Sequence, residues 1–287
     1  MGHKGEKYMS FSSEIKKELS ELNNLGKKEE VKYELLGYFF SDNILNDEKK
    51  VKFSTESEYN INRFSKLLRN MSIDDFNIEI QGKIYIITLE YSQYKNIVYG
   101  NNDEFLKKEE LFKSFIRGLF LGSGSINNPN NNYHLEIKMP DNKWINIIVG
   151  NLKNYGINVK SMDKSIYIKD GEEISKFLAF IGAGKSVLDF EEIRVQRHMN
   201  NKVNRLVNCQ TANLNKVLNA SVEQINAIKR LKENGNFNKM DKSLQELAEL
   251  RLEHPDSSLV ELGAMLKKPI GKSGVNYRMK RIIELAK

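Results

Sequence analysis

The sequence predicts an α+β body made of two copies of one unit, followed by an all-α domain. Two segments carry this prediction: LLGYFFSDN at residues 35–43 and FIRGLFLGSGSIN at residues 115–127. Both are typical of helices with a glycine in the interior, Gly37 in the first and Gly118 in the second. Because such a glycine costs about 1 kcal/mol relative to alanine, we expect the two helices to approach each other closely enough to require it.

The elements around the first glycine-bearing helix, at residues 31–40, can be read in order. Ser12 and Ser13 precede an amphipathic segment and predict a capped helix before it. Apolar residues two positions apart at 51–53 predict a strand, and apolar residues three or four positions apart at 61–68 predict a helix. The alternating segments 76–80 and 84–91, joined by Gln81-Gly82, predict a hairpin.

The same order recurs after the second glycine-bearing helix, which we expect to end near Gly124. The predicted elements are a strand at 133–137, a helix at 144–155, strands at 159–162 and 165–169, and a helix at 173–181 that Gly182 and Gly184 stop. Gly37 and Gly118 are 81 positions apart, a suitable length for one α/β unit. An internal duplication explains this order most economically. It predicts a pseudo-twofold body with a sheet facing outward from each half.

The remaining chain predicts a connector and a helical domain. Residues 190–219 are rich in asparagine and contain no acid after Glu192, which indicates a connector that is part helix. Helices are expected at 221–232, 243–252, 259–266 and 275–286, with a cap at Ser257 or Ser258, a capping interaction of Glu261 and a cap at Ser273. The turn KKPIG at 267–271 lies between the last two helices, and this arrangement predicts a helix-turn-helix.

Composition limits the possible classes of protein. The chain has 287 residues, one cysteine and a net charge of +7. No apolar run approaches the roughly 18 residues that span a bilayer, and the N-terminus has no signal-peptide core. Basic charge is concentrated at 194–216, which holds no acid, and at 265–287, where seven basic residues oppose Glu284 alone. Two cationic segments in an otherwise acidic chain favour nucleic acid as the partner.

The last helix carries the candidate DNA-binding residues. Its apolar positions Val275, Met279, Ile282 and Ile283 share one face, which leaves polar and basic side chains on the other. Asparagine can pair with adenine and arginine or lysine with guanine, while turn lysines suit phosphate. The candidates are Lys267, Lys268, Lys272, Ser273, Asn276, Tyr277, Arg278, Lys280 and Arg281. A three-helix bundle that binds protein is the alternative for this domain.

These residues also carry a family resemblance. The two glycine-bearing helices resemble degenerate copies of the LAGLIDADG helix of homing endonucleases, and the chain from Met9 to its end is similar to the WhiA family of bacterial sporulation and cell-division regulators. The run NRLVNCQTANLNK is its most recognisable part in the connector. The expected organisation is an extension at 1–8, LAGLIDADG-like repeats at 9–95 and 96–185, a basic connector at 186–220, and a helix-turn-helix domain at 221–287.

The resemblance also bears on catalysis. In active LAGLIDADG nucleases each motif helix ends in an acid, and the pair holds a divalent metal. The matching positions here are Asp42 and Ser123, and a serine hydroxyl supplies no negative charge for a hard cation. Cys209 has no neighbouring base in the sequence that would activate it. We therefore expect no catalytic residues, no metal site and no cofactor.

The sequence thus predicts a non-enzymatic, sequence-specific transcription regulator that binds double-stranded promoter DNA through its last helix. The resemblance implies a role in sporulation or cell division, and another transcription factor or RNA polymerase is a further candidate partner. A cytoplasmic, nucleoid-associated protein without a membrane partner is expected. Two alternatives remain: a metal-dependent DNA endonuclease, and a protein-interaction scaffold that uses the N-terminal body.

Overall fold

The computed structural model describes residues 9–47, 49–99, 103–140 and 142–287. The chain forms two compact units, Met1–His198 and Met199–Lys287. The extension expected at 1–8 lies outside the described residues. Within the described part, no helix combines the length and apolar character that crossing a membrane requires.

The first unit opens with helix α1, Phe11–Ser20, which precedes the first copy of the duplicated unit. Its N-cap is Ser10, whose side chain accepts a hydrogen bond from the backbone N–H of Ser13 at 3.2 Å, so the helix begins earlier than Ser12 and Ser13 predicted. The elements of the first copy are α2 Lys28–Phe39, β1 Ile44–Asn46, β2 Lys50–Thr55, α3 Glu58–Asn70, β3 Phe76–Gln81, β4 Ile84–Glu90 and α4 Tyr91–Val98.

The second copy follows a short 3-10 helix, η1 Asp103–Lys107. Its elements are α5 Glu109–Ser123, β5 Gly124–Ile126, β6 Leu135–Lys138, α6 Ile145–Asn154, β7 Lys160–Met162, β8 Ser165–Ile168 and α7 Gly171–Ile181. The two antiparallel sheets have the strand orders β1-β2-β4-β3 and β5-β6-β8-β7. Equivalent strands occupy equivalent places, which confirms the duplicated α+β body.

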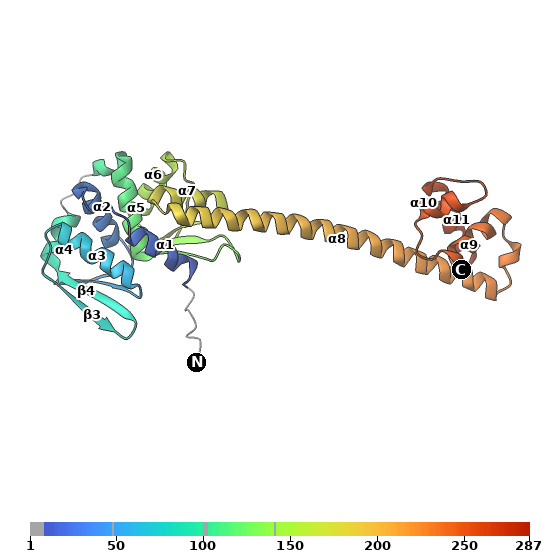
Figure 1. Cartoon of the computed structure of the whole chain (residues 1–287), viewed down its shortest axis with the longest axis horizontal. Helices are drawn as coiled ribbons and strands as arrows, with labels where there is room; N and C mark the ends of the chain where they lie inside the picture. The colour runs from blue at the N-terminus through green and yellow to red at the C-terminus, as the bar shows by residue number, and fades with distance from the viewer. Residues whose placement is uncertain (1–8, 48, 100–102, 141) are drawn as a thin grey trace. The chain divides into compact units, whose positions relative to one another are not determined.

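The helices α2 and α5 pack against each other at the centre of the body (Figure 1). A Cβ atom at Gly37 would overlap the carbonyl oxygen of Phe115, and one at Gly118 would overlap the carbonyl oxygen of Glu34. Each glycine therefore lets the backbone of the other helix approach. This contact is the one that the two glycine-bearing segments predicted, and it offsets their cost to the helices.

A buried charged network ties the two halves together beside this contact. Glu34 on α2 is fully buried and accepts hydrogen bonds from Arg63 on α3 at 2.8 and 2.9 Å and from Arg117 on α5 at 3.1 Å. Both guanidinium groups also donate to main-chain carbonyls, Arg63 to Leu22 and Arg117 to Ile181, each at 2.7 Å. The network satisfies the buried charges with hydrogen bonds, as burial of a carboxylate requires.

The second unit contains the end of α8 and a three-helix domain. Helix α8 is continuous from Gly184 to Glu233, so the prediction that residues 190–219 are only part helix, with a new helix opening at Ser221, was wrong. Ser221 instead lies inside α8, where its hydroxyl donates to the carbonyl of Pro255. The elements that follow are η2 Phe237–Lys239, α9 Lys242–Glu253, α10 Leu259–Met265 and α11 Lys272–Leu285.

Candidate nucleic-acid interface and the seam of the body

Helix α11 is held by a small apolar core that fixes which of its faces is exposed. Val275, Met279 and Ile282 are buried against α8, α9 and α10, together with Leu262 and Leu266. These buried positions recur every three or four residues, as an amphipathic helix requires. The opposite face of α11 is therefore held outward by the packing of the core.

The turn before α11 depends on close backbone contact. A Cβ at Gly263 of α10 would overlap the carbonyl oxygen of Ile270, and the Ile270 N–H donates to the Gly263 carbonyl at 3.1 Å. The start of α10 carries the predicted capping box, in which Ser258 and Glu261 bond each other's backbone N–H groups. These contacts set α10 and α11 in a helix-turn-helix arrangement.

The sequence-predicted residues lie on the outward face of α11 and in the turn before it. Arg278 is partly buried and the others are exposed. The complete set is Lys267, Lys268, Lys272, Ser273, Asn276, Tyr277, Arg278, Lys280 and Arg281. Among the described residues, Arg281 pairs with Glu284 at 3.3 Å on the surface, and the Glu246 carboxylate accepts a hydrogen bond from the backbone N–H of Lys267 at 2.7 Å. The face presents predominantly cationic and hydrogen-bonding groups.

The N-terminus of α11 differs from the sequence prediction. Its N-cap is Gly271, not Ser273, and no side chain caps the first turn. Ser273 lies inside the helix, one residue after Lys272. Because uncapped N-terminal N–H groups and the helix dipole favour anions, this end of α11 suits a phosphate that approaches beside Lys272.

The seam of the body holds the positions where an active nuclease of the resembled class would have two acids. Asp42 follows α2 and is exposed, whereas Ser123 ends α5 and donates its hydroxyl to the carbonyl of Lys138. Nearby, the amide of Asn43 donates to the carbonyl of Gly122 at 2.6 Å. Among the described residues, no group of three or more His, Cys, Asp or Glu side chains is placed to hold a metal ion.

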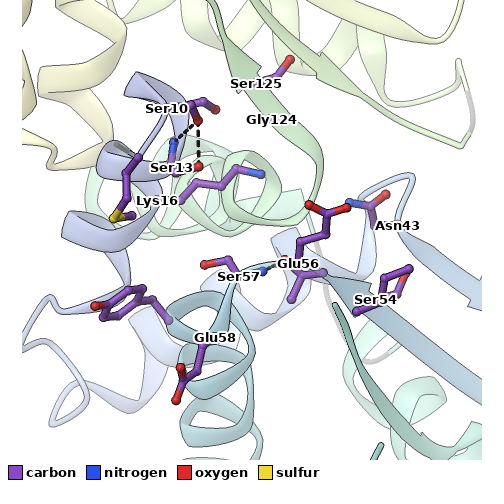
Figure 2. Close-up of a pocket in the computed structure, with 15 residues that line it drawn as sticks. Ser10, Ser13, Lys16, Asn43, Ser54, Glu56, Ser57, Glu58, Gly124 and Ser125 are labelled. Carbon is purple, nitrogen blue, oxygen red and sulfur yellow. Dashed lines mark hydrogen bonds between the residues drawn. The ribbon is translucent and has the colours of Figure 1, made fainter. Parts of the chain in front are cut away.

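A cavity of about 760 Å³ lies next to the seam. Figure 2 shows the Lys16 side chain extending into it from α1, towards the strand that carries Gly124 and Ser125, with Asn43 and Glu56 across the cavity. Burial lowers the pKa of the Lys16 ammonium to about 8. The sequence did not predict this cavity, because Lys16 and Glu56 lie outside the glycine-bearing helices and no motif connects them.

The fold and these sites define a helix-turn-helix protein with a duplicated, LAGLIDADG-like body. The chain matches the family model described as the WhiA LAGLIDADG-like domain over residues 112–200, and the one described as the WhiA C-terminal HTH domain over residues 203–286. It is 35% identical to a "Probable cell division protein WhiA" of Clostridium tetani, in an alignment covering 97% of each chain. The chain belongs to the WhiA family.

Other relatives and solved structures agree with this assignment. A "Probable cell division protein WhiA" of Desulfitobacterium hafniense is 40% identical over 97% of this chain and 96% of its own. The full-length DUF199/WhiA crystal structure from Thermotoga maritima is 33% identical, covers 97% of this chain and 98% of its own, and has a TM-score of 0.61. A structure of an N-terminal LAGLIDADG domain of DUF199/WhiA is 32% identical over 61% of this chain and 94% of its own, with a TM-score of 0.52.

Proposed function

We propose that this protein is a sequence-specific, double-stranded-DNA-binding transcription regulator whose reading element is α11. The observation that carries the proposal is the outward face of α11, where Asn276, Arg278 and Lys280 are presented by a packed helix-turn-helix. In that arrangement the recognition helix enters the major groove, and residues near its N-terminal end contact base edges. The cell-division names of the relatives support a role in that process.

In this proposal the residues of the interface have separate tasks. Asn276 and Arg278 read bases, and Lys267, Lys268 and Lys272 bind phosphates with the uncapped end of α11. Ser273, Tyr277, Lys280 and Arg281 complete the DNA-binding surface. Phosphate contacts fix the orientation of a protein on DNA and make binding salt-dependent, whereas base contacts carry the sequence preference.

We further propose that the body has no nuclease activity. The supporting geometry is the seam, where the hydroxyl of Ser123 is bonded to the main chain opposite an exposed Asp42. Two-metal or single-metal phosphodiester hydrolysis requires negative ligands that hold the cation at the scissile phosphate. The body then acts as a scaffold, and another transcription factor or RNA polymerase is a candidate partner for it.

Two experiments test these assignments. Genome-wide occupancy followed by footprinting on purified promoter fragments should give one recurrent short target, and removal of residues 221–287 should abolish binding to it. Undiminished binding after this truncation would refute the assignment to the C-terminal domain. Supercoiled plasmid incubated with Mg²⁺ or Mn²⁺ should stay intact, and metal-dependent nicking that Asp42→Asn removes would contradict a silent body.

A further inference from the structure

Helix α8 contains an 11-residue repeat that the proposed function does not use. Three consecutive segments, RVQRHMNNKVN, RLVNCQTANLN and KVLNASVEQIN, occupy residues 194–204, 205–215 and 216–226. Each begins with Arg or Lys, has an aliphatic residue at its second and tenth positions, and ends with Asn. Eleven residues make three turns of 3.67 residues, so equivalent positions share one helix face and recur about every 16.5 Å.

The second, sixth and tenth positions of each repeat form a stripe along α8 that is apolar except at Gln210 and Ser221. Their spacing of four, four and three residues keeps them on one side of the helix. The stripe consists of Val195, Met199, Val203, Leu206, Gln210, Leu214, Val217, Ser221 and Ile225, and Val207 and Leu218 widen it. Its middle is exposed: Met199 is 62% accessible, Leu206 60% and Leu214 59%.

The same face of α8 changes its environment along the second unit. Near the C-terminal end of the helix, Ser221 and Ile228 are buried in the core of the helix-turn-helix domain, at 4% and 0% accessibility. Between Met199 and Leu218, no side chain of the stripe belongs to a hydrophobic cluster of the described residues. The same face of α8 is therefore buried near Ser221 and Ile228 and exposed between Met199 and Leu218.

The opposite side of α8 is basic and polar. The first, fourth and eleventh positions of the repeats face away from the stripe and hold Arg194, Arg197, Asn204, Arg205, Asn208, Asn215, Lys216, Asn219 and Asn226. Lys202 is the basic residue that borders the stripe. Because most of the charge lies on the far side, two stripes can pair without bringing rows of like charges together.

We propose that the stripe is covered by α8 of a second copy of this chain, so that two copies form a coiled coil with an 11-residue repeat. A partner that stays in register over three repeats must carry the same period, and α8 itself has that period. Gln210 occupies the midpoint of the stripe, where it meets Gln210 of the other copy. The side-chain amide has both donors and an acceptor, so this polar pair is self-complementary and sets the register.

The exposed part of the stripe sets the size of such an interface. Full burial of a Val, Leu or Met side chain removes roughly 60–120 Å² from water, judged from its transfer free energy. The seven exposed side chains between Met199 and Leu218 are 38–62% accessible, so on two helices they bury about 450–900 Å². The positions beside the stripe must supply the rest of the roughly 1,200–2,000 Å² of stable interfaces.

The test measures the mass of the full-length protein in the absence of DNA, by sedimentation equilibrium and light scattering. The chain should have twice its monomer mass, and Leu206→Glu with Leu214→Glu should convert it to a monomer with unchanged helix content. Asn208→Glu, on the opposite side of the same helix, is the matched control and should remain a dimer. A monomeric natural chain, or a dimer that survives the double change, would overturn the proposal.

Cross-linking supplies a second readout that does not depend on stability. In a Cys209→Ser background, Gln210→Cys should form a disulfide-linked dimer rapidly under mild oxidation, because the midpoint residues face each other. Asn208→Cys should cross-link far more slowly in the same background. Equal rates for the two variants would contradict pairing through the stripe. Since no DNA is present, the outcome is independent of whether α11 reads a sequence.

Discussion

Replacement of Glu34 by glutamine tests the buried network that joins the two halves of the body. The carboxylate of Glu34 accepts three hydrogen bonds from Arg63 and Arg117, at 2.8, 2.9 and 3.1 Å. Glutamine has nearly the same shape but removes the negative charge and turns one acceptor into a donor that faces a guanidinium. Since breaking a buried ion pair by removing one partner costs about 3–5 kcal/mol, we expect a loss of that size in the free energy of unfolding.

The chain provides its own probe for this measurement. Trp144 is the sole tryptophan and lies in the body, packed edge-on against Phe40. Its fluorescence during heating therefore reports unfolding of the first unit alone. For a unit of this size, a loss of 3–5 kcal/mol corresponds to a melting temperature lower by about 6–20 °C.

The control is the exposed Glu29 on the same helix. Glu29→Gln should change the stability by less than about 0.5 kcal/mol, as surface substitutions do. If Glu34→Gln and Glu29→Gln melt within about 2 °C of each other, the network does not hold the halves together and the reasoning from buried charge fails.

Two further substitutions test other parts of the body. Gly37→Ala places a methyl group against the carbonyl of Phe115, and because backbone cannot move aside cheaply we expect a loss of about 1–3 kcal/mol in the Trp144 melt. Gly150→Ala, with open space around it, should be neutral or stabilising by up to about 1 kcal/mol, and equal losses in both would refute the close approach. The pKa of Lys16 is about 8 in the folded body, against an ordinary value of 10.5. Between these two pH values Lys16 is protonated in the unfolded chain but not in the folded one. The free energy of unfolding should therefore rise with pH across that window. Lys16→Met should remove this rise and stabilise the protein at pH 7 by about 1–3 kcal/mol; a pH–stability curve unchanged by the substitution would contradict it.

The duplication was predictable because it rests on a local signal. Gly37 and Gly118 lie in helix interiors, where glycine is unfavourable unless another backbone approaches, and the structure shows that each does face the other helix. The period-2 and period-3.6 patterns gave the strands and helices around them. The short strands β1 and β5 were missed, since their sequences ILN and GSI do not alternate apolar and polar residues.

The features that the sequence did not predict depend on long-range contacts or on competing local preferences. Glu34 meets Arg117 across 83 residues, and no local pattern indicates that a charged side chain will be buried. Residues 190–219 are rich in asparagine, a weak helix former, and so indicated a connector that is only part helix, although α8 is continuous there. At α11 the sequence predicted Ser273 as the N-cap, but Gly271 takes that position.

The candidate site was likewise predicted only where a local sequence pattern determines it. The amphipathic pattern of α11 placed its exposed residues in advance, since Val275, Met279 and Ile282 are buried as their spacing indicated. The cavity beside Lys16 could not be predicted, because its walls come from α1, β2, the start of α3 and β5. Only the folded body brings these segments together.

The most direct test of the account compares two paired substitutions in α11 and its turn, in the full-length protein and on the target found by footprinting. Asn276→Ala with Arg278→Ala should relax the sequence preference by about 1–3 kcal/mol per residue. Lys267→Ala with Lys268→Ala should weaken binding to all sequences alike and reduce the log–log salt slope by about 1.8. Retention of the full preference after loss of both Asn276 and Arg278 would contradict the claim that α11 reads DNA.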